Sequence, residues 1–151
     1  PSPTPYHQIV SLLLGELFLN AARRTGGRAY VAPLDVHLSD ETVVQPDVIY
    51  ISPQNRDVVQ DWIRGAPDIV VEVASPSTFR RDRVHKLPEY ATAGVKEFWI
   101  VDPMMETIEF LRLEGGAYRH ETFKGNVYHS AQFPEIEIDL TAFWNEVQAR
   151  K

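Results

Sequence analysis

The chain has 151 residues, of which 44% are hydrophobic and 24% charged, a composition typical of one globular domain over residues 1–151 rather than of a disordered chain. It contains no cysteine, which excludes disulfides and zinc–thiolate sites, and no run of about 18 apolar residues that would span a membrane. We therefore expect a cytoplasmic protein, whose net charge of −6 argues against a surface that adheres as a whole to nucleic acid or anionic membranes.

The first half of the chain predicts one helix followed by strands. Apolar residues recur at helical spacing in residues 6–27, and a Gly–Gly pair supplies the stop. Residues 28–39 and 43–52 are rich in alternating β-branched residues, which predicts two strands joined by a turn. The polar stretch 52–67 predicts a loop with a short helical turn.

The second half predicts a strand at residues 68–74, a helix at 80–94 and a closing helix at 140–149 with Thr141 near its cap. Pro88 must lie in the first turn of its helix or kink it. Three further short strands are predicted, at 96–102, 107–113 and 117–123. This order favours a mixed α/β fold with a central mixed sheet flanked by helices, not a doubly wound one, and no glycine-rich phosphate loop is present.

The predicted strand at residues 68–74 carries a carboxylate within the most apolar run of the chain. Burying an unpaired carboxylate costs several kcal/mol, so Glu72 needs a partner or a use. Because side chains alternate across a strand, Glu72 points with Asp68 to the face opposite the apolar residues Ile69, Val71 and Val73. Glu72 therefore does not interrupt the core face.

A second carboxylate, Asp47, opens the preceding predicted strand, and an antiparallel pairing would place it opposite Glu72. Two carboxylates about 4 Å apart repel by roughly 4 kcal/mol at an effective dielectric constant of about 20. Either one of them is protonated or a cation lies between them. Mg²⁺, or Mn²⁺ in its place, fits such a pair because Mg²⁺ takes one or two carboxylates and keeps its other positions for water and phosphate.

A locally basic segment follows Glu72 in this acidic chain, and it contains Lys86. Carboxylates, a lysine and a basic rim are what metal-assisted phosphodiester hydrolysis requires. The ion lowers the pKa of a bound water, and the lysine orients that water or stabilises the transition state. We expect the arginines of this segment to be solvated surface residues rather than DNA contacts; they are Arg80, Arg81 and Arg83.

Three motifs occur together at this spacing: "VQPDVIYIS" around Asp47, "APDIVVEVASPST" around Glu72 and "RDRVHKLPEYATAGVKEFWIVDP" around Lys86. In combination they resemble the Uma-two family of restriction-endonuclease-like proteins, of the PD-(D/E)XK nuclease superfamily, over most of the chain. The resemblance implies a restriction-endonuclease-like fold with a metal site at the sheet, DNA as the substrate and, often, a homodimer.

Residue by residue, the resemblance implies that Asp47 is the first acid of the motif, Glu72 the second acid and Lys86 the lysine. It also implies an additional metal contact from the carbonyl of Val73. The superfamily pattern E-x-K would place the lysine at Ala74, so this sequence departs from it. Lys86 must then reach the same point in space from the following helix.

Other candidates stay open at this stage. The dipeptide "PD" occurs twice, and we prefer Asp47 as the ligand because Asp68 follows a proline at a strand start, where a turn-capping role is adequate. Glu16 is expected on the surface of the first helix rather than in the site. For His7, a helix-cap or structural hydrogen bond explains the residue at least as well as catalysis.

The resulting prediction is a metal-dependent endonuclease that hydrolyses phosphodiester bonds in DNA with Mg²⁺ or Mn²⁺. The alternative is a catalytically inactive nuclease-fold module for binding or dimerisation, which the net charge and the absent strand lysine favour. A carboxylate-pair glycosidase fits less well, because it leaves the lysine and the basic segment unexplained. The sequence begins at Pro1 rather than at methionine, which leaves room for a preceding segment.

Overall fold

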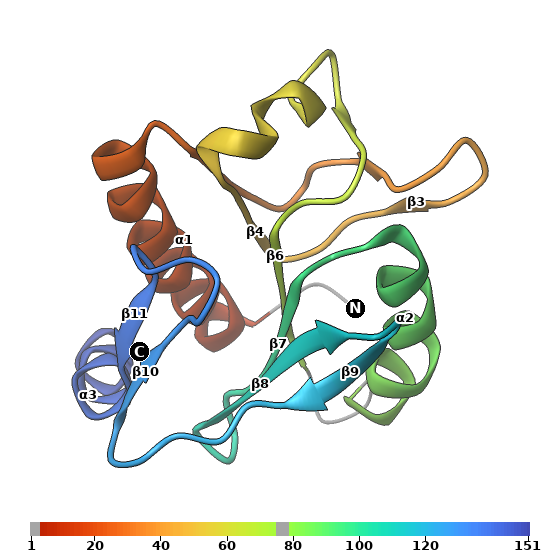
Figure 1. Cartoon of the computed structure of the whole chain (residues 1–151). Coiled ribbons are helices and arrows are strands. Elements are labelled where there is room, and N and C mark those ends of the chain that lie inside the picture. Colours follow the sequence, from red (N-terminus) through yellow and green to blue (C-terminus); the bar gives the residue numbers. More distant parts are fainter. Residues whose placement is uncertain (1–3, 75–78) are drawn as a thin grey trace.

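The computed structural model describes residues 4–74 and 79–151, and for residues 79–85 it describes the backbone alone. Six strands form the central sheet: β1 (Arg28–Val31), β4 (Val48–Ile51), β6 (Ile69–Val73), β7 (Glu97–Asp102), β8 (Thr107–Glu114) and β9 (Ala117–His120). They lie in the order β1-β4-β6-β7-β8-β9 (Figure 1). Only the neighbours β6 and β7 are parallel, so the sheet is mixed, as predicted.

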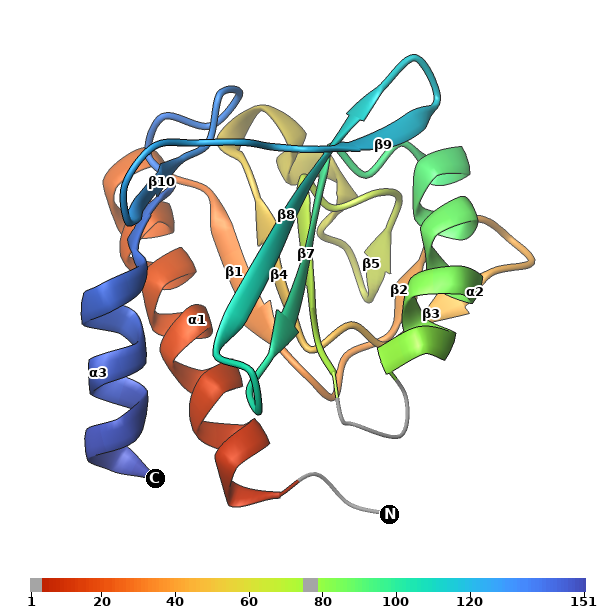
Figure 2. The same ribbon diagram turned by 90° about the horizontal axis from the view of Figure 1, so that it is seen from below.

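Helices cover both faces of this sheet. On one side lie α1 (Pro5–Thr25) and α3 (Leu140–Arg150), and on the other lies α2 (Phe79–Ala93) (Figure 2). The α1 face is a core built around Phe18, Val71 and Trp99, and the α2 face is a second core that contains Tyr90 and Phe98. Among the described residues, no helix is long and apolar enough to cross a membrane.

The first helix begins and ends where the sequence predicts. The Thr4 side chain caps it by accepting a hydrogen bond from the His7 backbone N–H at 3.1 Å. At the other end Gly26 adopts a left-handed conformation with φ +88°, which glycine tolerates without steric cost. The cap fixes His7 in the first turn of α1.

Two of the predicted strands are each split in two. Prolines at positions 33 and 46 interrupt them, because proline has no N–H for a strand ladder. The additional pieces are β2 (Val36–His37) and β3 (Val43–Val44), which join β5 (Ile63–Arg64) in a small sheet of order β3-β2-β5. The predicted helical turn is the 3₁₀ helix η1 (Pro53–Val58), whereas β5 was not predicted.

Pro88 lies well inside α2, which excludes the first turn and leaves the other predicted alternative, a kink. Two details of the second half differ from the prediction. Asp139, not Thr141, caps α3, because its side chain accepts a hydrogen bond from the Ala142 N–H at 3.0 Å. An unpredicted ribbon precedes α3, formed by β10 (Val127–His129) and β11 (Glu137–Asp139).

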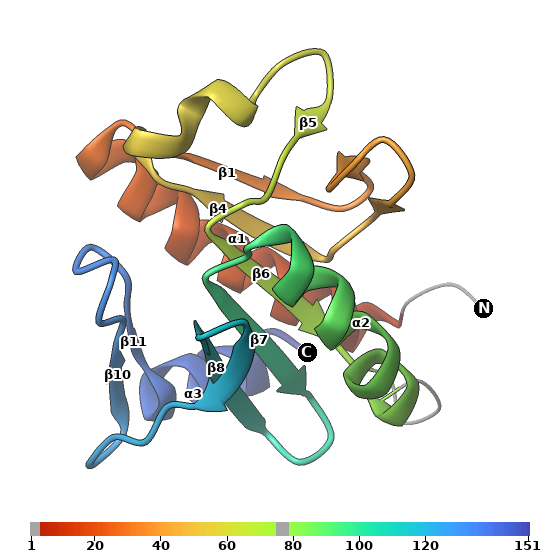
Figure 3. The ribbon, with the colours of Figure 1, turned by 45° about the vertical axis from the view of Figure 1, so that its right-hand side comes forward.

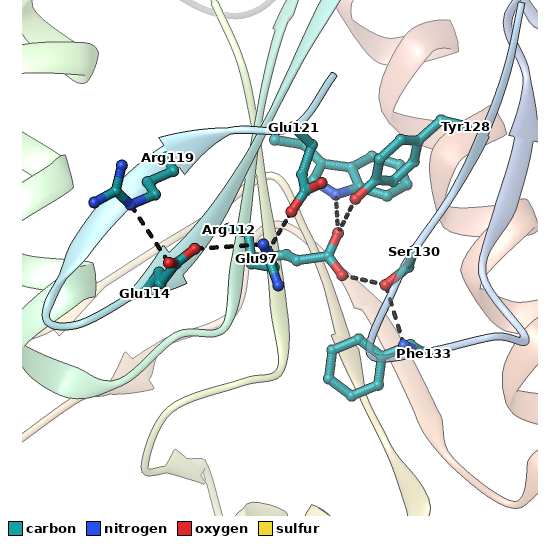
Figure 4. Close-up of polar contacts among 9 residues, drawn as sticks. Glu97, Arg112, Glu114, Arg119, Glu121, Tyr128, Ser130 and Phe133 are labelled. Atoms are coloured by element: carbon teal, nitrogen blue, oxygen red, sulfur yellow. Dashed lines mark hydrogen bonds and ion pairs between the residues drawn. The ribbon is translucent and has the colours of Figure 1, made fainter. Parts of the chain in front are cut away.

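A buried carboxylate ties this ribbon to the central sheet. Glu97 at the start of β7 accepts hydrogen bonds from Trp99 Nε1 at 3.1 Å, from Tyr128 Oη at 2.8 Å and from the Ser130 hydroxyl (Figure 4). The Ser130 oxygen in turn accepts from the Phe133 N–H at 3.1 Å. Burial raises the pKa of Glu97 above its ordinary value, although the three donors act in the opposite direction.

Candidate functional site

Asp47 and Glu72 lie opposite each other where β4 begins and β6 ends. The antiparallel register pairs Val48 with Val71, so the next position outward pairs Asp47 with Glu72. The Asp47 N–H donates to the Val71 carbonyl at 3.2 Å, which continues the ladder beyond β4. The two acids are therefore brought to the same edge of the sheet.

Asp47 is held by the end of β6 and by the start of α1. Its Oδ2 accepts a hydrogen bond from the Val73 N–H at 2.7 Å. His7 Nε2 lies 3.6 Å from Asp47 Oδ1 and 3.1 Å from the Val73 carbonyl oxygen. Because a carbonyl oxygen only accepts, Nε2 carries the proton of this hydrogen bond. The close Asp47 carboxylate raises the pKa of His7 against the effect of burial, and the hydrogen bond to the Val73 carbonyl adds to this rise.

Glu72 is held instead by α2, on the other face of the sheet. It is only 4% exposed, and its Oε1 lies 3.3 Å from Lys86 Nζ. The Tyr90 hydroxyl donates to the same oxygen at 2.7 Å. Burial, followed by the charge of Glu72, raises the pKa of Tyr90 far above its ordinary value, so Tyr90 stays a donor. The face that carries Glu72 is thus buried as well, beneath α2.

The structure therefore brings together the four residues that the sequence singles out: Asp47, Glu72, Val73 and Lys86. Lys86 reaches Glu72 from α2, while Ala74, where an E-x-K pattern would place the lysine, is buried. Their roles in metal binding and catalysis stay predictions.

Two other candidates lie elsewhere. Asp68 is at the opposite end of β6, where its Oδ2 accepts from the Ser52 N–H at 2.6 Å and from Asn55 Nδ2 at 3.2 Å. Glu16 is exposed and lines a groove between α1 and α3. The side chains of residues 80–85, which include the three arginines of the predicted basic segment, lie outside the described part of the structure.

Sequence reasoning missed Tyr90 and left His7 open. The signal for Tyr90 was present, because it follows Lys86 by four residues and such a spacing places two side chains on the same side of a helix. His7 carried no comparable signal, since only the packing of α1 on the sheet brings it to Val73.

The oxygen atoms at this edge suit a hard divalent cation. Two carboxylates and a backbone carbonyl are ligands that Mg²⁺ and Mn²⁺ accept. His7 Nε2 lies within 3.6 Å of both the Asp47 and the Val73 oxygen, so a single group can contact these two atoms together. Among the described side chains, those of residues 4–74 and 86–151, no three His, Cys, Asp or Glu gather to hold a metal, so an ion held by these residues would rely on water or phosphate for its other positions.

Comparison with solved structures assigns this fold to a nuclease-like class. The chain matches "a putative nuclease belonging to DUF820" from Anabaena variabilis with a TM-score of 0.78 and 15% identity, over 97% of this chain and 84% of the other. A family model described as "Putative restriction endonuclease" matches residues 1–141, so the chain belongs to the Uma2 family, and the predicted family and fold are confirmed. A search of curated proteins finds no match.

Proposed function

We propose that this protein is a metal-dependent endonuclease that hydrolyses phosphodiester bonds in DNA with Mg²⁺ or Mn²⁺. The observation that carries the proposal is the contact of Lys86 Nζ with Glu72 Oε1 at the sheet edge where Asp47 and the Val73 carbonyl also lie. Family membership and the nuclease-like fold support the same reaction class.

Each residue then has a defined task. Asp47, Glu72 and the Val73 carbonyl would hold the ion. When bound, the ion lowers the pKa of a coordinated water and offsets charge on the phosphate. Lys86, whose side chain is 32% exposed, can donate hydrogen bonds to the attacking water or to the scissile phosphate while its stem remains packed.

A second candidate function is a nuclease-fold module that binds or dimerises without turnover. His7 already lies against Asp47, and the positive Lys86 lies against Glu72, so both acids have a nitrogen partner in the absence of a metal. The net charge of −6 also disfavours broad contact with DNA. Metal binding separates the two candidates.

We also propose a homodimer, in keeping with the family resemblance. Leu12 and Leu19 are exposed on α1, and Val31 is exposed on β1, the edge strand of the sheet. Val31 lies against Gly15, which shares a helix face with both leucines, so the three form one apolar patch. Light scattering should give twice the monomer mass, and charged replacements of Leu12 and Leu19 should halve it.

The test of the proposed function is a calorimetric titration of Mn²⁺ into the wild type and into Glu72→Ala. We expect saturable binding to the wild type, with the melting temperature raised by about 5–10 °C at a hundredfold excess over Kd. Both effects should disappear in Glu72→Ala, because the site loses one of its two carboxylates. Metal binding does not require the right DNA sequence to be guessed.

Glu16→Ala is a suitable control, because it removes an exposed carboxylate that lies away from this edge. It should bind Mn²⁺ as the wild type does. No binding to the wild type, or equal binding to Glu72→Ala, would favour the non-catalytic module instead.

A further inference from the structure

Tyr90 is a fully buried tyrosine whose hydroxyl donates a hydrogen bond to the Glu72 carboxylate at 2.7 Å. The proposed hydrolysis gives it no task. A buried tyrosine needs a hydrogen-bond partner, yet a backbone carbonyl would be sufficient for that, as Tyr118 illustrates by donating to the Val95 carbonyl at 2.7 Å. The choice of Glu72 as the partner therefore calls for an explanation.

We propose that Tyr90 is a positioning residue for Glu72 and fixes the direction of its carboxylate for a divalent cation such as Mn²⁺. This inference rests on the proposed function, because it assigns a task to Tyr90 only if Glu72 holds the ion.

Tyr90 is itself held rigidly. Its ring packs edge-on against Phe98 of β7, with the ring centres 5.0 Å apart, inside the core beneath α2. Its backbone carbonyl accepts the two hydrogen bonds that close α2, from the Gly94 and Val95 N–H groups, both at 3.1 Å. Figure 3 shows α2 lying in front of β6 and β7. The hydroxyl is thus fixed in space by the sheet and by the end of the helix.

Lys86 and Tyr90 contact the same oxygen of Glu72, but in different ways. Lys86 carries its positive charge at the end of a flexible, partly exposed side chain. Its ammonium group can therefore move from Glu72 to a water or a phosphate. Tyr90 brings no charge and has only two side-chain torsions, both restricted by packing. Tyr90 can therefore hold the carboxylate in place while Lys86 moves.

Burial also limits what else Tyr90 can do. Its side chain has no exposed surface, so it cannot touch a DNA substrate or deliver a proton to a leaving group. Hydrogen bonds to a ligating carboxylate are a known means of raising metal affinity, and their removal typically costs about 10–100-fold. This range sets the expected size of the effect.

The experiment is a titration of Mn²⁺ into the full chain carrying Tyr90→Phe, which keeps the packed ring and removes the hydroxyl. We expect Kd to rise about tenfold or more. Tyr118→Phe is the matched control, because its ring also packs against Phe98, with the ring centres 6.1 Å apart, and its hydroxyl donates to a backbone carbonyl. If Tyr90 has only a structural role, both substitutions should change the melting temperature, and neither should change the affinity for Mn²⁺.

Lys86→Ala provides a second arm that does not depend on the folding of Tyr90→Phe. If Tyr90 rather than Lys86 orients Glu72, Lys86→Ala should bind Mn²⁺ within about threefold of the wild type or more tightly, because a competing cation is gone. An unchanged Kd in Tyr90→Phe, or a tenfold loss in Lys86→Ala, would overturn the inference and leave the proposed function standing. A wild type that binds no Mn²⁺ would overturn both.

Discussion

Replacing Lys86 with alanine is expected to slow DNA cleavage by about 10²–10³-fold while leaving the fold and Mn²⁺ binding nearly intact. Removing one preorganised donor from a catalytic site typically has this effect, because the donor acts where charge develops in the transition state. Lys86 is well placed for this task, since its ammonium lies 3.3 Å from Glu72 and its side chain is partly open to solvent. Cleavage of mixed plasmid and linear DNA, measured with saturating Mg²⁺ and excess enzyme, gives the rate.

Lys96→Ala is the matched control for this experiment. Lys96 also pairs with a buried carboxylate of the same strand region, with Nζ 3.7 Å from Asp68 Oδ1, but at the opposite end of β6. Its removal should leave the cleavage rate within about twofold of the wild type, since Lys96 lies at the end of β6 away from the proposed site. If Lys86→Ala cleaves as fast as Lys96→Ala, or unfolds at the assay temperature, the Lys86–Glu72 pair is structural.

The positions of the site residues could be predicted largely from local rules. Strand alternation placed Glu72 on the face away from the α1 core, and antiparallel pairing placed Asp47 opposite it, as the register has it. Lys86 was identified as a site residue from the motif spacing of the family, not from any periodicity in the sequence. The sequence could not show that the Glu72 face is itself buried, because that depends on α2 folding back over β6 and β7.

Contacts that depend on tertiary packing were beyond the sequence. His7 reaches the Val73 carbonyl across 66 positions of the chain, and nothing local marks the two as partners. Strands of only two or three residues, such as those in the small sheet and in the ribbon before α3, are too short for alternation to be recognised. For the same reason Glu97 looked like an ordinary residue of a buried strand, although two of its donors lie 31 and 33 positions away.

Glu97→Ala is expected to lower the free energy of unfolding by about 3–5 kcal/mol, the largest stability effect that we predict. The substitution leaves buried donors on Trp99, Tyr128 and Ser130 without their acceptor, and each such group costs about 1–3 kcal/mol. At about 2–4 °C per kcal/mol, the thermal midpoint should fall by about 10 °C. Glu137→Ala, which removes an exposed acid from β11, should shift it by less than about 2 °C.

The pH dependence separates the charge of Glu97 from its hydrogen bonds. Because the pKa of Glu97 is raised in the folded state, its contribution to stability is complete below the unfolded value of about 4.3 and is lost as pH rises through the folded value. Glu97→Gln keeps an acceptor oxygen and cannot ionise, so its stability relative to the wild type should improve from pH 4 to pH 7 in urea unfolding. If the free energies of unfolding of the two proteins changed in parallel with pH, the network would stabilise the ionised form of Glu97 as well as its protonated form. For the Glu97→Ala substitution, an unchanged thermal midpoint would mean that apolar packing alone holds the ribbon to the sheet.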